Sequence, residues 1–391
     1  MAFEVFCHSV TGQYHLQQRM SCEDFGLTHK GENSDYKVFA VADGLGDLRC
    51  VRSGIGSQLA CEAARDCLAA FAEQMLQEDR GYTGELITAR IPDELIKPVC
   101  ETWRERVKEH YESVPMSEKE KNDSKIMTCG DDFRVEKLYN TTLIAGLLLE
   151  ERYLILLQQG DGHCVVLGEN GEPSFPIPWD EDCIGNITTV MGGHDVTERM
   201  RSALLDLHST KISACFLATD GLEDSFTNLD ELSLELSAIA MEAASVPITE
   251  YLPQLGVKLS KYTQLGSGDD ITVATILDAE HIVSIQDTWE EKIEKSRRKG
   301  ELEKTIFRAE DKIRSMTRKH EKLERQYHVL EEQIARKKED LSHLDDAISD
   351  LEQALAQTRE EYESYHAKFL EQIERKEAAQ AELDKWNGGE S

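Results

Sequence analysis

Hydrophobic and polar positions follow two different patterns along the chain, and the change falls near residue 285. Before this point, short runs of apolar and β-branched residues alternate with longer amphipathic stretches. Such a run predicts a buried strand when a turn signal closes it, as Asp-Gly closes the run at 36–44. The same reasoning predicts strands within 140–172, 213–221 and 268–277.

Helices are predicted where apolar residues recur every three to four positions. They cover residues 53–78, 92–113 and roughly 229–262, and the polar stretch 112–132 is expected to be a loop. Because strands and helices come in blocks instead of strict alternation, the pattern favours an α+β fold with antiparallel sheets. We assign residues 1–285 to this domain.

From residue 286 onward a single helical pattern replaces the mixture. With Leu302 as position d, apolar or aromatic residues fill about sixteen of twenty a and d positions over about ten heptads. This repeat predicts a left-handed coiled coil. Since neither glycine nor proline interrupts residues 301–387, we expect one continuous helix of roughly 130 Å. The remaining a and d positions include Ile306, Ala309, Ile313, Met316, His320, Leu323, Tyr327, Leu330, Ile334, Leu341, Leu344, Tyr362 and Phe369.

The apolar seam of this predicted helix needs a partner that covers it. The alternatives are a second copy of the chain, another protein or, less favoured, the chain's own domain. We predict that residues 286–391 form a parallel homodimer, with a foreign partner helix as the alternative. The imperfect seam positions His320, Lys337 and Thr358 would weaken the pairing and select its register or partner.

The formal charge of the whole chain is −31, and it is concentrated in the first domain. Residues 286–391 hold 21 Lys and Arg against 27 Asp and Glu, a net of −6, which leaves −25 for residues 1–285. A domain with this much negative charge repels a nucleic-acid backbone and an anionic membrane. The same charge favours the binding of divalent cations and of basic protein partners.

The ten cysteines form no CxxC pair, which argues against a structural zinc site. We interpret them as reduced thiols and expect a cytoplasmic location. The start of the chain lacks the basic and apolar stretches of a signal peptide, and no apolar run reaches about 18 residues, so no membrane span is predicted.

Acidic residues stand beside glycine at the ends of predicted strands in four places, and a fifth acidic pair precedes a strand. One such Asp-Gly pair is ordinary turn chemistry. Five of them gathered at one edge of a sheet would repel strongly unless cations lay between them, and oxygen ligands suit Mg²⁺ or Mn²⁺. The five places are Asp43-Gly44, Asp161-Gly162, Asp220-Gly221, Gly268-Asp269-Asp270 and Glu23-Asp24.

In their order and residue types, these segments resemble the conserved motifs of the metal-dependent protein phosphatases of type 2C. The resemblance extends over about residues 8–275. The chain departs from the family pattern at Leu45, Asn140, Gly162, His163 and Asp270. The matching segments are Arg19-Met-Ser-Cys-Glu23-Asp24, VFAVADGLGD, Gly56-Ser57, NTTLIAGLL, QGDGHCVVL, FLATDGLED and SGDDITVATI.

The resemblance implies a four-layer α-β-β-α sandwich with two divalent ions, Mn²⁺ or Mg²⁺, and a possible third at one end of the sheets. It implies that Asp43 bridges the two ions and that the Gly44 carbonyl binds one of them. Asp220 and Asp269 match further metal ligands of the family, and Glu23 and Asp24 match residues that bind the metals or orient metal-bound water. Asp161 matches the ligand of the weaker third metal. Arg19 matches the arginine whose guanidinium binds the phosphate.

The implied activity is hydrolysis of phosphoserine or phosphothreonine in a phosphoprotein by a metal-activated water, without a phosphoenzyme. Some family members carry a histidine after the first Asp-Gly as general acid; here Leu45 stands there, so water takes that role. The alternative is a catalytically weak, phosphatase-like scaffold that acts through its coiled coil.

Asp270 either adds charge beside the metals or faces solvent. His163 and His194 are interpreted as exposed or hydrogen-bonded residues, and the loop around NITTVMGGHD as a cover of the channel mouth.

Overall fold

The computed structural model describes residues 3–33, 35–47, 50–78, 81–124, 133–183, 187–339 and 345–387. These residues form two compact units, Met1–Glu291 and Lys292–Ser391. The division lies six residues beyond the expected boundary at 285, because Trp289 belongs to the core of the first unit, where it is 2% exposed.

Two five-stranded sheets form the centre of the first unit, and every strand pairing in them is antiparallel. Sheet A contains, in spatial order, β1 (Glu4–Val10), β10 (Ile271–Leu277), β9 (Ile212–Ala218), β6 (His163–Gly168) and β7 (Pro173–Ser174). Sheet B contains β2 (Phe25–Lys30), β3 (Tyr36–Ala42), β4 (Leu143–Leu149), β5 (Tyr153–Gln159) and β8 (Arg201–Asp206).

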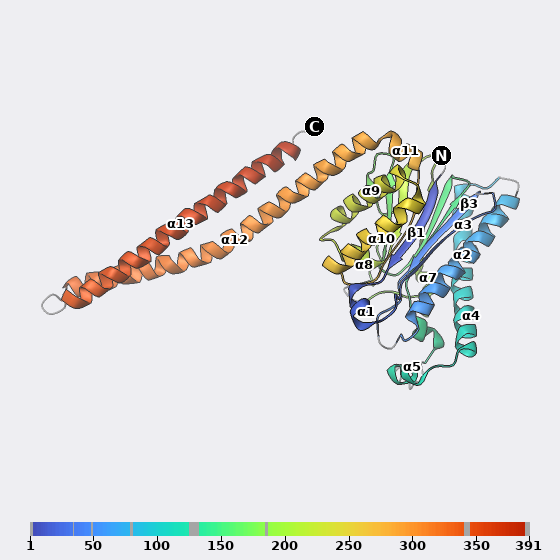
Figure 1. Cartoon of the computed structure of the whole chain (residues 1–391), viewed down its shortest axis with the longest axis horizontal. Helices are drawn as coiled ribbons and strands as arrows, with labels where there is room; N and C mark the ends of the chain where they lie inside the picture. Colours follow the sequence, from blue (N-terminus) through green and yellow to red (C-terminus); the bar gives the residue numbers. More distant parts are fainter. Residues whose placement is uncertain are drawn as a thin grey trace. The chain divides into compact units, whose positions relative to one another are not determined.

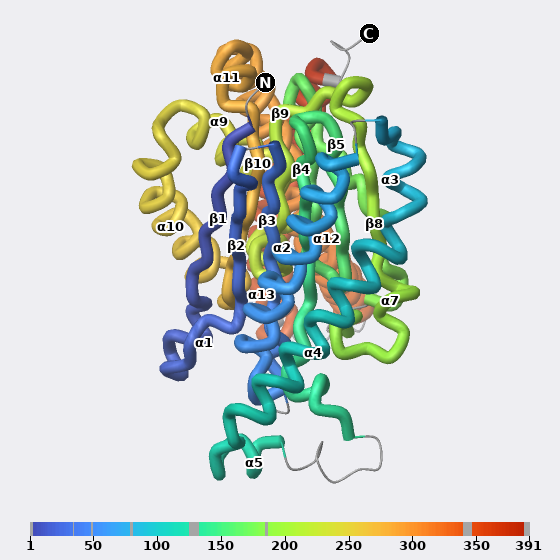
Figure 2. The backbone as a smooth tube through the Cα atoms, turned by 90° about the vertical axis from the view of Figure 1, so that its right-hand side faces the viewer, coloured from blue at the N-terminus to red at the C-terminus, as the bar shows by residue number. Residues whose placement is uncertain are grey.

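Helices cover the outer face of each sheet, so the unit has the four layers expected from the sequence (Figures 1 and 2). Sheet B packs against α2 (Ser53–Gln77), α3 (Gly84–Ile91) and α4 (Lys97–Ser113), and sheet A against α9 (Leu229–Ser245) and α10 (Ile248–Leu265). The shorter helices are α1 (Gln13–Gln18), η1 (Pro92–Ile96), α5 (Glu118–Asp123), η2 (Val135–Tyr139), α7 (Val196–Arg199), α8 (Asp220–Glu223) and α11 (Ala279–Ser284).

Strand β3 shows why its sequence is an almost unbroken apolar run. Val38 and Ala40 point into the core beneath the helices, whereas Phe39 and Val41 point between the two sheets. Successive side chains of a strand face opposite sides, and here both sides are buried. The apolar run therefore predicted a central strand correctly.

Two helix predictions and one loop prediction needed adjustment. The predicted helix 92–113 begins with the π-helical turn η1 before α4. The stretch 229–262 is two helices, because Pro247 has no N–H to continue α9. The predicted loop 112–132 contains α5, whose Ser117–Glu120 capping box satisfies its first N–H groups. Residues 125–132 lie outside the described residues.

The prediction of one continuous helix after residue 286 is wrong. Helix α12 (Gln286–Glu339) and helix α13 (Asp345–Asn387) run antiparallel as a hairpin, with an Arg298–Glu382 ion pair near one end and a Lys338–Glu352 pair near the other. The seam positions Leu341 and Leu344 lie outside the described residues. A long apolar seam is stabilised when it is covered, and folding back covers it within one chain.

Position d of α12 carries most of the hairpin's packing. Its first four d residues, Leu302, Ala309, Met316 and Leu323, are each less than 10% exposed, whereas Leu330, Lys337 and most a residues are half-buried. The seam that a parallel homodimer would use is therefore already occupied by α13. Self-association stays a prediction, which light scattering of the full chain would test. In the part of the chain that the structure describes, no helix is long and apolar enough to cross a membrane.

A buried arginine joins the start of α2 to α5. The Arg52 guanidinium donates to Glu120 Oε1 and to the Tyr139 hydroxyl, both at 2.7 Å, and its side chain is 2% exposed. The hydrogen bond from Arg52 lowers the pKa of Glu120 to about 2. This pair fastens the α5 segment to the helical layer over sheet B.

We expect Glu120→Gln to lower the free energy of unfolding by about 2 kcal/mol at pH 7, because it leaves the Arg52 charge poorly paired. The folded-state pKa of Glu120 lies below its ordinary value of 4.5. The stabilisation is therefore present above about pH 4.5 and is lost as the pH falls through about 2. Urea unfolding at pH 7 and pH 3 measures it, with exposed Glu118→Gln as the control; a difference independent of pH would contradict the argument.

Candidate active site

The antiparallel registers bring the predicted acidic residues to one end of both sheets. In sheet B, Phe25 pairs with Ala42, so Asp24 and Asp43 lie side by side just beyond these strands. In sheet A, Val273 pairs with Ala218, which places Asp220 beside the Asp269–Asp270 segment. Asp161 joins them because it connects the end of β5 to the start of β6 at this same edge.

The backbone of Asp43 is held by two threonines of the Asn-Thr-Thr segment. Thr142 Oγ1 accepts from the Asp43 N–H at 3.0 Å, and the Asp43 carbonyl accepts from Thr141 Oγ1 at 2.7 Å and from the Thr142 N–H at 2.8 Å. These bonds fix the direction in which the Asp43 carboxyl leaves the strand. They give the Asn-Thr-Thr segment a physical role that its spacing alone did not reveal.

Three carboxyl groups meet at the centre of this edge. The side chains of Asp43 and Asp220 lie within hydrogen-bonding reach of each other. Burial, followed by the nearby charges of Asp24 and Asp220, raises the pKa of Asp43 well above its ordinary value. Burial and the charge of Asp161 raise the pKa of Asp220 to about 6. The carboxylates thus repel one another in a poorly hydrated place.

Asp24 and Glu23 each carry a buried oxygen that lacks a hydrogen bond. Asp24 is 6% exposed, and its Oδ2 accepts from Thr219 Oγ1 at 2.8 Å. Asp24 Oδ1 and Glu23 Oε2 have no hydrogen-bond partner among the described residues. An unsatisfied buried carboxylate oxygen is costly, and a bound cation would satisfy it. The donor set therefore fits a hard divalent ion.

Asp270 is buried, so the interpretation that it faces solvent is wrong. It is 3% exposed; its Oδ1 accepts from the Gly12 N–H at 2.6 Å and its Oδ2 from the Glu23 N–H at 2.6 Å. His15 Nδ1 lies 2.9 Å from the same Oδ2. Asp270 thereby ties the segment that carries Glu23 and Asp24 to the start of β10. Neither His15 nor Gly12 stood out in the sequence, since their partner lies more than 250 residues away.

Gly44 occupies a position where no side chain fits. A Cβ atom there would lie 2.7 Å from the Glu23 carbonyl oxygen and 2.8 Å from the carbonyl carbon of Ser53. Glycine allows the turn after Asp43 to lie directly against the Glu23 segment and the start of α2. Leu45, which follows, donates its N–H to the Asn140 carbonyl at 3.1 Å.

Arg19 stands apart from the carboxylates. It is exposed, and it ends α1 in the left-handed conformation with φ of 58°. Among the described residues it forms no ion pair with an acidic side chain, which leaves its guanidinium available for a ligand. The structure thus brings the carboxylates together and places Arg19 on the turn that ends α1.

Asp161, Glu223 and Asp224 extend the acidic edge beyond β5. Burial raises the pKa of Asp161, and burial together with the charges of Glu223 and Asp269 raises the pKa of Asp224. Neither Glu223 nor Asp224 is among the carboxylates predicted from the sequence. His163 Nε2 hydrogen-bonds to Glu223 Oε2, and His194 is exposed, in line with their interpretation as hydrogen-bonded and exposed residues.

The loop around NITTVMGGHD lies beside the same edge. The Met191 N–H donates to the Thr141 carbonyl at 2.9 Å, and Arg134 donates to the Gly192 carbonyl at 2.6 Å. Residues 184–186 lie outside the described residues. Within the described ranges, no three acidic, histidine or cysteine side chains already have the close geometry of a metal cage. Metal ligation is therefore a proposal here.

Comparison with known proteins identifies the family. The model of the family described as Protein phosphatase 2C matches residues 11–253, which is more than half of the chain. The chain belongs to the protein phosphatase 2C family, and the family resemblance and the sandwich fold expected from the sequence are confirmed. No curated protein matches the chain significantly.

Several solved structures are similar to the chain at low sequence identity. The RsbU and RsbW domains of Rv1364c from Mycobacterium tuberculosis are 15% identical with a TM-score of 0.35, covering 70% of this chain and only 59% of that one. The SpoIIE phosphatase domain from Bacillus subtilis is 10% identical, with a TM-score of 0.33 and coverage of 71% and 92%. A phosphatase from Toxoplasma gondii is 11% identical, with a TM-score of 0.39 and coverage of 71% and 92%. Since these TM-scores are below 0.5, the family assignment rests on the family model.

Proposed function

We propose that this protein phosphatase is a Mn²⁺- or Mg²⁺-dependent enzyme that hydrolyses phosphoserine and phosphothreonine in a phosphoprotein. The observation that carries the proposal is the convergence of Asp24, Asp43 and Asp220, whose pKa values are raised by burial and by the charges of neighbouring carboxylates. Buried carboxylates of this kind are stable as anions only with cations beside them. One buried oxygen each of Glu23 and Asp24 lacks a hydrogen-bond partner among the described residues, and this favours the same conclusion.

The residues that would hold two ions come from four segments of the chain. We propose that Asp43 would bind both ions and that the Gly44 carbonyl would bind one of them. A weaker third ion is assigned to Asp161. The ions would supply Lewis-acid charge that activates water as the nucleophile and offsets charge on the phosphoryl oxygens. The remaining proposed ligands are Glu23, Asp24, Asp220 and Asp269.

The chain's own side chains complete the proposed chemistry. Arg19 binds two phosphoryl oxygens with its planar fork, which holds phosphorus in line for attack. A thiolate nucleophile is disfavoured, because burial raises the pKa of Cys7 to about 12 and also raises that of Cys22. This disfavours Cys7 and Cys22 as nucleophiles and agrees with direct attack by water.

Hydrolysis of p-nitrophenyl phosphate and of a phosphothreonine peptide tests this function. The purified full chain should turn over both substrates with millimolar Mn²⁺ and stop when the metal is chelated. No turnover by a folded sample would defeat the proposal. The alternative is a non-catalytic scaffold, which the departures at Leu45 and Asn140 favour. Calorimetry distinguishes the scaffold from the enzyme, because a scaffold with a broken site should bind no Mn²⁺.

The cellular setting is also proposed. A reducing, cytoplasmic location is supported by the described cysteines, all of which are free thiols. Phosphoprotein substrates are the expected partners, with no nucleic acid and no membrane, since the net charge is −31. A homodimer or a partner helix at the hairpin remains a further proposal.

Asp270 provides a test of the support behind the site. We expect Asp270→Ala to lower Mn²⁺-dependent turnover about 10- to 100-fold, because the segment that carries Glu23 loses its anchor. Asp270→Asn keeps an acceptor for only one of the two N–H groups, of Gly12 and Glu23, and should recover part of the rate. Steady-state kinetics over a Mn²⁺ titration measure the effect. Equal rates for Asp270→Ala and the wild type would contradict the assigned role.

A further inference from the structure

Two exposed aromatic side chains lie beside the acidic edge, on the segment after β7. Trp179 is 53% exposed and Phe175 is 41% exposed. The His163 ring stacks on Trp179 with centroids 5.7 Å apart and planes 21° apart, and it meets Phe175 edge-on at 6.2 Å. Because His163 covers one face of Trp179, the exposed area belongs to the opposite face and the edges. We call Phe175, Trp179 and His163 the aromatic platform.

The segment that carries this platform is fastened to the end of β5. Arg201 donates to the Pro178 carbonyl at 2.6 Å and to the Gly160 carbonyl at 2.5 Å. Thr189 Oγ1 donates to Asp180 Oδ2 at 2.8 Å and accepts from the Gly160 N–H at 3.2 Å. These bonds place the platform next to Asp161. A surface that is already ordered loses little conformational entropy when a ligand binds.

Negative charge borders the platform on the side of the metal-ligand candidates. His163 is held by Glu223 through its Nε2 atom, and Asp224 follows directly in the chain. Asp161 lies at the same edge, because it connects the end of β5 to the start of β6, the strand that begins at His163. The surrounding domain carries a net charge of −25 over residues 1–285, the remainder of −31 after −6 for the hairpin segment. This potential attracts cations and repels anionic ligands.

We propose that the aromatic platform binds an arginine or lysine side chain of the phosphoprotein substrate, close to the phosphorylated residue. This inference rests on the proposed function and names its substrate class. The face of an indole ring attracts a cation, and a guanidinium also stacks flat on it. Glu223 supplies the opposite charge beside the ring. An apolar partner would use the rings but would gain nothing from the carboxylates, so a cation uses both features.

The test compares two phosphothreonine peptides that differ only in arginine or alanine at the positions flanking the phosphothreonine. For each enzyme variant, the ratio of kcat/KM for the arginine peptide to that for the alanine peptide is measured with Mn²⁺. We expect Trp179→Ala to lower this ratio about 2- to 30-fold, mainly through KM. Trp179→Phe should keep part of the preference. Phe307→Ala, at a 65% exposed aromatic residue of α12, is the matched control and should leave the ratio unchanged.

The outcomes separate the platform from the proposed function. A wild-type ratio clearly above one that falls in Trp179→Ala and at high salt supports the inference. A wild-type ratio near one, or a ratio that Trp179→Ala leaves unchanged, overturns the platform while the phosphatase activity stands. Absence of turnover of both peptides and of p-nitrophenyl phosphate overturns the platform and the proposed function together.

Discussion

Replacing Asp43 by asparagine should abolish the Mn²⁺-dependent phosphatase activity, with a loss of at least about 10³-fold in kcat. Lewis-acid stabilisation of the transition state is worth several kcal/mol, and about 1.4 kcal/mol corresponds to a factor of ten. Asp43 is the proposed bridging ligand, and its backbone is fixed by Thr141 and Thr142. Asparagine has the same shape but lacks the charge that two cations require.

The same variant separates loss of catalysis from loss of folding. Burial and neighbouring carboxylates raise the pKa of Asp43 in the metal-free protein, so removing this group removes repulsion. Without metal, Asp43→Asn should therefore unfold at the same temperature as the wild type or at a higher one. Calorimetry should show lost Mn²⁺ binding, and exposed Asp93→Asn serves as the control. Retention of more than about a tenth of the activity would contradict the assignment of Asp43.

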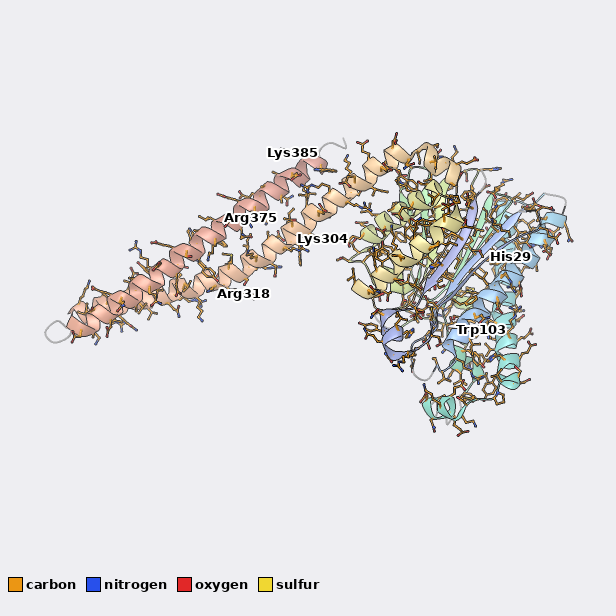
Figure 3. All side chains as sticks on the ribbon, viewed as in Figure 1. His29, Trp103, Lys304, Arg318, Arg375 and Lys385 are labelled. Atoms are coloured by element: carbon orange, nitrogen blue, oxygen red, sulfur yellow. The ribbon has the colours of Figure 1, made fainter. Side chains whose placement is uncertain are left out.

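Replacing Trp103 by alanine should cost about 3–5 kcal/mol of unfolding free energy. Trp103, labelled in Figure 3, lies on α4 and is fully buried in the core formed with α2 and sheet B. Its indole N–H donates to the Gly56 carbonyl at 3.1 Å. Alanine would leave a cavity and remove this hydrogen bond. Since a domain is stable by only about 5–15 kcal/mol, this loss is a large part of the total.

Urea unfolding followed by near-ultraviolet circular dichroism measures this loss. Trp179→Ala is the matched control, because Trp179 is 53% exposed and its removal should change the unfolding free energy by less than about 0.5 kcal/mol. If Trp103→Ala cost less than about 1 kcal/mol, the packing of α4 against α2 would be in error.

The long-range pairings of the site had to come from the structure. The sequence placed carboxylates at strand ends, because Asp-Gly closes an apolar run in a recognisable way. It gave no means of pairing Asp270 with Gly12, or Glu223 with His163, since such bonds depend on which strand ends become neighbours. The burial of Asp270 likewise depends on the α1 segment folding over it.

The hairpin shows the same limit in the second unit. The heptad repeat correctly predicted helices with an apolar seam, because that seam is a local property of the sequence. A repeat does not state which surface covers it: a second chain, a foreign helix and the chain's own returning helix all match the same seam. Contacts such as Arg298 with Glu382 and Lys319 with Tyr365 decide for the returning helix.

The sequence by itself therefore determined the strands within 36–44, 140–172, 213–221 and 268–277, the helical repeat, the family and the set of candidate carboxylates, all of which depend on residues near one another in the chain. It did not predict the strands β1, β2 and β8. Only the tertiary structure decided that Asp270 is buried, that α13 covers α12, and that Trp179 stands beside the acidic edge. Burial and distant contacts depend on how the whole chain packs, and the periodicity of a local segment does not contain that information.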